Sequence, residues 1–194
     1  NIASMIKLPS HKTKRIITQN TQAKKDYEAL KISPKTFIKL DIEDAVLDAW
    51  MITPPNFDPD KKYPVIFYVY GEPAGSTVQN KWEGGDLWHQ YMAQQGYVVM
   101  SVDNRGTDVP RGREWRKGIY GEVGVLASQD QAKAALKACE LYPFLDCERI
   151  GIWGWSGGGS MTLNCMFRYP NIYKTGIAVA FVADQKLYDT IYQE

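Results

Sequence analysis

From residue 36 onward the chain alternates between short apolar segments and segments with helical periodicity. Residues 37–42 and 45–52 alternate apolar and polar positions with period two, which predicts a hairpin of two half-buried strands. Residues 65–70 are almost wholly apolar, as expected for a strand covered on both faces. Helical and strand-like segments then alternate through residues 87–95, 97–102, 127–141, 150–153, 157–168 and 175–180. This order predicts an α/β fold with a mainly parallel, doubly wound sheet.

The first 32 residues follow a different pattern. Two short strand-like runs, residues 3–8 and 15–18, flank a basic turn, and a polar segment from residue 20 to 31 has helical character. We therefore expect two parts. Residues 1–32 would be the tail of a preceding domain with its linker, and residues 33–194 would belong to the α/β domain.

The composition narrows the possible partners. Of 194 residues, 44% are apolar, which is enough for a substantial core, and 23 Lys and Arg nearly balance 22 Asp and Glu. This balance gives no electrostatic reason to expect nucleic acid or an anionic membrane as a partner. No apolar run approaches the ~18 residues of a transmembrane helix, so no membrane span is expected.

The cysteine pattern argues against a metal site. Cys139, Cys147 and Cys165 make an odd number and show no Cys-x-x-Cys spacing, which argues against a zinc site and against a full disulfide framework. Cys139 and Cys147 lie close enough in sequence to bridge across a helix end in an oxidising compartment. Free, partly buried thiols are the expectation, and neither a metal nor a cofactor is expected.

The segment Gly154-Trp155-Ser156-Gly157-Gly158 is a G-x-S-x-G motif between a predicted strand and a predicted helix. That order is the context of a nucleophile elbow, a strained turn that exposes a catalytic serine. A Walker loop would need a Gly-Lys-Ser/Thr ending, and a dinucleotide fingerprint would need an acidic residue after the next strand. The chain has neither feature. No Gly-Lys-Ser/Thr ending is present, and the next strand-like run, residues 175–180, is followed by Phe181 instead of an acidic residue. We therefore predict that Ser156 is a nucleophile.

Several separated motifs resemble the catalytic domain of the prolyl oligopeptidase family, specifically its dipeptidyl peptidase IV branch. They are "KYPVIFYVYGEP", "VDNRG", "RIGIWGWSGGG", "YKTGIAVA" and "LYDTIYQE". The resemblance implies an α/β-hydrolase fold, here C-terminally truncated, with residues 1–32 similar to the end of the family's β-propeller. It also implies a serine exopeptidase that removes short N-terminal peptides, dipeptides above all, from peptide substrates with Pro or Ala near the N-terminus. A homodimer and a periplasmic or other extracytoplasmic location are further implications.

The same resemblance assigns roles around Ser156. In this fold the backbone N–H of the residue after the nucleophile, Gly157, stabilises the oxyanion. The family's second donor is a tyrosine hydroxyl, which matches Tyr70, although a tyrosine that only packs at a strand end stays open as an alternative. The aromatic pocket for a proline ring would be lined by four residues: Trp155, Val182, Tyr188 and Tyr192.

Three positions depart from the family pattern. Gly157 stands where the pattern has an aromatic residue after the serine, and Gln185 stands where it has Trp. Both changes remove aromatic wall, so we expect a roomier and more polar pocket. Glu72 replaces a Gly beside Tyr70; its carboxylate could bind a substrate ammonium, but we expect it to face water.

Asp103 and Arg105 are expected to fix loops around the site rather than to act on substrate.

The chain lacks the partners that would activate Ser156. In this fold the triad follows the order Ser, then Asp or Glu, then His, but no histidine follows Ser156. His11 and His89 precede it, and we expect an exposed or capping role for His89. Asp184 and Asp189 come too soon after the elbow to be the triad acid. We therefore expect part of a longer exopeptidase, inactive alone; an esterase or other acyl hydrolase, or a non-catalytic hydrolase-like binding domain, are the alternatives.

Overall fold

A computed structural model describes residues 2–81 and 87–190 of the chain, which divides into two compact units, Asn1–Ile32 and Ser33–Glu194. In the first unit, strands β1 (Ala3–Lys7) and β2 (Lys12–Thr18) pair antiparallel, and helix α1 (Thr21–Ala29) follows. None of the residues in these three elements is buried, so this unit has no hydrophobic core of its own.

The second unit is built on a six-stranded sheet with the strand order β3-β4-β6-β5-β7-β8. The antiparallel β3–β4 hairpin joins β6 antiparallel, and β6, β5, β7 and β8 run parallel to one another. This mostly parallel sheet confirms the predicted α/β class. The strands are Thr36–Asp41 (β3), Val46–Ile52 (β4), Tyr63–Tyr68 (β5), Val98–Asp103 (β6), Leu145–Trp155 (β7) and Thr175–Val179 (β8).

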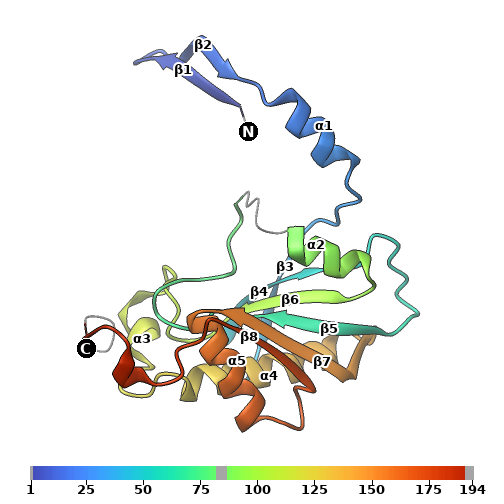
Figure 1. The fold of residues 1–194 in the computed structure, drawn as a ribbon, viewed down its shortest axis with the longest axis vertical. Coiled ribbons are helices and arrows are strands. Elements are labelled where there is room, and N and C mark those ends of the chain that lie inside the picture. Colours follow the sequence, from blue (N-terminus) through green and yellow to red (C-terminus); the bar gives the residue numbers. More distant parts are fainter. Residues whose placement is uncertain (1, 82–86, 191–194) are drawn as a thin grey trace. The chain divides into compact units, whose positions relative to one another are not determined.

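Helices cover both faces of this sheet (Figure 1). Helix α2 (Leu87–Gln94) packs on one face, and helices α4 (Val125–Leu141) and α5 (Gly157–Arg168) pack on the other. Two short elements were not expected from the sequence: helix α3 (Gly112–Lys117) and the 3-10 turn η2 (Gln185–Leu187). Among the described residues, no helix combines the length and apolarity needed to cross a membrane.

Strand β5 shows why its sequence is apolar at nearly every position. Val65 and Phe67 point into the core with α4 and α5, whereas Ile66 and Tyr68 belong to the core under α2. Successive side chains of a strand point to opposite faces, so a strand between two helical layers buries all of them. The continuous apolar run of β5 therefore indicates a central strand that is covered on both faces.

The expectation for His89 is wrong. His89 lies on α2 and is only 5% exposed, because this face of α2 packs on the sheet. Its ring lies 5.3 Å from that of Trp50, 4.8 Å from that of Tyr68 and 5.5 Å from that of Trp153, measured between centroids. His89 is therefore part of an aromatic core cluster.

The expectation of free thiols at Cys139 and Cys147 is also wrong. These residues form a disulfide, with their Cα atoms 6.0 Å apart. The chain turns back between α4 and β7, which brings the last turn of the helix beside the start of the strand. Cys165 is free and buried in α5, and burial raises the pKa of its thiol to about 12. Its thiol therefore stays protonated at neutral pH and is a poor nucleophile.

The disulfide predicts a specific pattern of stability changes. Cys139→Ser should lower the free energy of unfolding by about 2 kcal/mol, because the open chain gains conformational entropy. Cys147→Ser should cost a similar amount, and the double variant should cost no more than either single variant. Chemical denaturation of the full-length protein measures these values. Alkylation of both residues in the unreduced, denatured protein would contradict the disulfide.

Candidate active site

Ser156 occupies a sharp turn between β7 and α5. Its backbone has φ 57° and ψ −122°, a conformation that residues other than glycine rarely adopt. The turn is held on both sides, because the Ser156 N–H donates to the Val179 carbonyl at 2.9 Å and its carbonyl accepts from the Ser160 N–H at 3.1 Å. Such strain at a partly exposed serine is the geometry of a nucleophile elbow.

The glycines around Ser156 let three backbone segments meet. A Cβ atom on Gly154 would overlap the carbonyl of Gly158 and lie 2.5 Å from the carbonyl oxygen of Val69. A Cβ atom on Gly158 would overlap the same Val69 carbonyl and lie 3.2 Å from the Cα of Tyr70. Backbone atoms cannot move aside as a side chain can, so these positions require glycine. The contacts bring the Tyr70 segment against the elbow of Ser156.

The loop that carries Tyr70 is fixed from two further directions. Gly71 has φ +81°, and a Cβ atom there would lie 2.8 Å from Cγ of Met161 in α5. The Asn104 side chain, which is fully buried, donates to the Gly71 carbonyl at 3.1 Å. Tyr70 itself is half-buried, and Gly75 lies against its ring, with an added Cβ 3.6 Å from Cε1. This loop therefore holds Tyr70 at the carboxyl end of the sheet.

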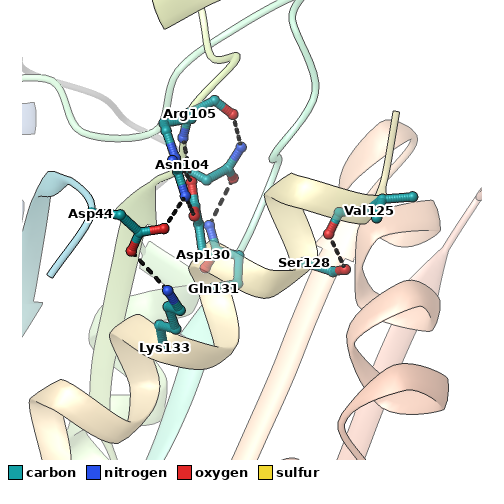
Figure 2. A network of polar contacts seen from close by, with 8 residues as sticks. All are labelled: Asp44, Asn104, Arg105, Val125, Ser128, Asp130, Gln131 and Lys133. Carbon is teal, nitrogen blue, oxygen red and sulfur yellow. Dashed lines mark hydrogen bonds and ion pairs between the residues drawn. The ribbon is translucent and has the colours of Figure 1, made fainter. Parts of the chain in front are cut away.

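Asn104 belongs to a buried polar network that the sequence analysis did not identify (Figure 2). The Gln131 amide donates to Asn104 Oδ1 at 2.9 Å and to the Val102 carbonyl at 2.8 Å, which links α4 to the end of β6. The signals in the sequence were the place of Asn104 in the "VDNRG" motif and its position two residues after the predicted strand of residues 97–102. A lone Gln in the middle of a helix carries no such signal.

Arg105, the next residue, ties the same strand end to α4 (Figure 2). Its guanidinium donates to both carboxylate oxygens of Asp130, at 2.7 and 3.0 Å, and Asp130 is fully buried. The hydrogen bond with Asp130 raises the pKa of Arg105. The Asp44 carboxylate lies 3.2 Å from the Arg105 guanidinium and 2.7 Å from the Lys133 ammonium. The hydrogen bond from Lys133 lowers the pKa of Asp44 to about 2. As expected, Arg105 fixes loops: its ion pairs hold the segment after β6 to helix α4 through Asp130 and to the β3–β4 turn through Asp44.

Asp103 fixes another loop beside the site. Its carboxylate accepts from the backbone N–H of Thr77 at 2.8 Å and of Val78 at 3.1 Å, a few residues beyond Tyr70. Asp103 is 2% exposed, and burial raises its pKa despite these hydrogen bonds. As expected, Asp103 holds a loop, namely the segment at Thr77 and Val78.

The four residues assigned to the pocket have different positions. Trp155 ends β7 and is 61% exposed, whereas Val182 is half-buried and exchanges hydrogen bonds with the Ser160 hydroxyl on α5. Tyr188 follows η2 and is partly exposed. Tyr192 lies outside the described residues. The structure thus ties the Val182 loop to the helix of the elbow and exposes the Trp155 indole next to Ser156.

The expectation that Glu72 faces water is wrong. Glu72 is 4% exposed, and its side chain lies against Gly157. The Glu72 carboxylate occupies the space that a side chain at position 157 would need. The sequence showed both residues as departures from the family pattern but did not show that they touch, because 85 positions separate them.

A cavity of about 690 Å³ opens beside this site. Pro73, one residue beyond Glu72, forms part of its wall, and the remainder comes from the segment that follows β6. Three cations of α3, namely Arg113, Arg116 and Lys117, line the cavity together with Asp108. The cavity therefore has a positively charged wall and lies next to the Tyr70 loop.

A strained serine on a strand–helix turn of a mostly parallel sheet, with a tyrosine loop packed against it, is the arrangement of an α/β-hydrolase fold. Residues 86–194 match the model of the prolyl oligopeptidase family. The chain belongs to the prolyl oligopeptidase family.

The relatives agree with this assignment. The chain is 34% identical over 189 residues to "Probable dipeptidyl peptidase 4" of Aspergillus flavus, covering 95% of this chain and 24% of the relative. It is 40% identical over 179 residues to "Probable dipeptidyl-aminopeptidase B" of Paracoccidioides lutzii, covering 92% of this chain and 19% of the relative. The crystal structure of Porphyromonas gingivalis dipeptidyl peptidase 4 superposes with a TM-score of 0.89 and 39% identity, covering 98% of this chain and 27% of that one. The chain thus spans about a quarter or less of the relatives it matches.

The buried ion pair behind the site predicts a stability change. Asp130→Ala should lower the free energy of unfolding of the full-length protein by about 3 kcal/mol, because Arg105 loses its buried partner. Asp146→Ala is the matched control: its pair with Arg149 lies at the surface, with side chains 24% and 57% exposed, so its loss should cost less than about 1 kcal/mol. Equal losses for the two variants would refute the structural role of Asp130.

Proposed function

We propose that this chain carries the nucleophile and the oxyanion donors of a serine exopeptidase that releases dipeptides from the N-termini of peptides. The observation that carries the proposal is the strained, positive-φ backbone of Ser156 on the elbow, with the Tyr70 loop packed against it. The names of the relatives, dipeptidyl peptidase 4 and dipeptidyl-aminopeptidase B, support the peptidase class.

In the proposed mechanism, Ser156 Oγ attacks the carbonyl carbon of the scissile amide as a base removes its proton. The carbonyl oxygen becomes an oxyanion, which the Gly157 N–H and the Tyr70 hydroxyl stabilise; one such donor contributes about 3 kcal/mol. The tetrahedral intermediate then collapses, the C–N bond breaks, and the protonated base transfers its proton to the leaving amine. Water hydrolyses the acyl-enzyme on Ser156 in the second half of the reaction.

The base is the missing element of this mechanism. Ser156 needs a general base, and in this fold the acid and the histidine of the triad come later in sequence than the serine. No histidine follows Ser156, and His89 is enclosed by aromatic rings of the core. We propose that other parts of the full-length protein supply the triad Asp and His, and that the 194-residue chain alone is inactive.

The specificity for Pro or Ala before the scissile bond is a proposal from the pocket residues. Trp155, Val182, Tyr188 and Tyr192 would line a flat slot for a proline ring. Trp155 presents an exposed indole directly before the nucleophile, and the Val182 loop is held on α5, so both are available to a substrate at Ser156. Gln185, where the family has Trp, would leave the slot wider and would admit alanine.

The arrangement of the full-length protein is proposed on the same basis. Residues 1–32 would be the end of a β-propeller with its linker, residues 33–194 would be the first part of the catalytic domain, and the full-length protein would be a homodimer. The Cys139–Cys147 disulfide supports a periplasmic or other extracytoplasmic location, because disulfides persist in oxidising compartments.

The nucleophile is tested with Ser156→Ala in the full-length protein. The wild-type protein should hydrolyse a Gly-Pro amide and should be labelled by a fluorophosphonate, and the variant should lose both activities because its hydroxyl is gone. Chromogenic assay and in-gel fluorescence measure the two outcomes. Persistent labelling would reveal a different nucleophile, and turnover of a simple acyl ester without amide turnover would identify an esterase.

The oxyanion role of Tyr70 is tested with Tyr70→Phe, which removes only the hydroxyl. The kcat for a Gly-Pro amide should fall about 100-fold while KM changes little, because the donor acts mainly in the transition state. Steady-state kinetics separate the two constants. A rise in KM at unchanged kcat would assign Tyr70 to substrate binding instead.

A further inference from the structure

Gly157 differs from the other glycines of the elbow in what requires it. It is the first residue of α5, and it is not among the glycines with positive φ, so its backbone would accept any residue. Gly158 and Gly159, in contrast, face backbone carbonyls, those of Val69 and Val179. Some other contact must account for the absence of a side chain at position 157.

That contact is with Glu72. A Cβ atom on Gly157 would overlap the Glu72 carboxylate, with Cδ at 2.5 Å and Cγ at 3.1 Å. Its three nearest neighbours all belong to the Glu72 side chain, and none is a backbone atom. Because Glu72 is 4% exposed, a group that needs the same space must displace a packed side chain.

We propose that Glu72 and Gly157 form a matched pair, in which the Glu72 side chain fills the space left by the missing side chain at position 157. The two departures from the family pattern, a Glu beside Tyr70 and a Gly after Ser156, are then one exchange of volume between two segments. The proposal rests on the proposed function for its catalytic meaning, and it assigns Glu72 as a positioning residue.

The position of Glu72 explains why this contact would affect catalysis. Glu72 lies two residues after Tyr70, and Gly157 supplies the backbone donor, so the contact joins the segments that carry the two oxyanion donors. Donors must stay within a few tenths of an ångström of their productive positions, and a displacement of about 1 Å can cost about 100-fold in rate. A side chain at position 157 would push these segments apart.

The test is a double-variant cycle in the full-length enzyme. Gly157→Ala should lower the kcat for a Gly-Pro amide at least about tenfold, with KM changed less than about threefold, because the methyl group displaces the Glu72 carboxylate. In the Glu72→Gly background the same change should cost less than about twofold, because the space is then empty. An equal loss in both backgrounds, or no loss in either, would overturn the proposal.

Two further variants separate shape from charge and from general damage to the elbow. Glu72→Gln keeps the volume of the side chain, so Gly157→Ala should cost as much in this background as with Glu72. Gly159→Ala meets the Val179 carbonyl and Phe181 instead, so Glu72→Gly should not relieve its cost. If Glu72→Gln relieves Gly157→Ala, charge is the cause and the volume exchange is refuted.

The melting temperatures of the same proteins provide a readout that needs no peptidase activity. Gly157→Ala should lower the Tm in the Glu72 background, and Glu72→Gly should remove that difference. A wild-type enzyme without amide turnover but with this coupling in Tm would reject the proposed function and retain the matched pair. Additive Tm changes together with normal turnover would reject the pair and retain the function.

Discussion

The close approach of three backbone segments around Ser156 is the constraint on which this site depends. Gly154 at the end of β7, Gly158 at the start of α5 and the carbonyl of Val69 after β5 lie so close that a Cβ atom on either glycine would overlap backbone atoms. This approach accompanies the positive φ of Ser156 and places the Tyr70 segment against the elbow. Ser156, the proposed nucleophile, and Tyr70, its proposed oxyanion donor, are therefore arranged by backbone packing before any side-chain hydrogen bond is considered.

The buried polar network behind the site holds this arrangement from the other side. Asn104 fixes the carbonyl of Gly71, and Gln131 and Asp130 fix Asn104 and Arg105 to helix α4. Every one of these residues lies at a strand end or on a helix that packs against it. These hydrogen bonds are made in one arrangement of the loops, so the network favours that arrangement, although Gln131 Oε1 has no partner among the described residues. The loop of Tyr70 is thus part of the rigid framework of the fold.

The residues around the elbow combine backbone strain with buried carboxylates, and both lower the stability of the fold. Ser156 has an unfavourable backbone conformation, and the raised pKa of Asp103 shows the cost of burying its carboxylate. Glu72 is a further buried carboxylate, and it lies against Gly157, the residue after Ser156. These costs gather at the carboxyl ends of β5, β6 and β7, where ligand sites of parallel sheets form, and the layered core beneath them offsets the loss.

The sequence by itself determined the α/β class, the strand–helix order and the elbow, because these follow from local hydrophobic periodicity and from a glycine pattern that few other turns need. Its predictions failed where the answer depended on residues distant in the chain. His89 is buried because α2 packs on the sheet, Cys139 reaches Cys147 because the chain reverses after α4, and Glu72 avoids water because Gly157 leaves it space. Only the tertiary structure decided these points, since burial and contact depend on which surfaces meet.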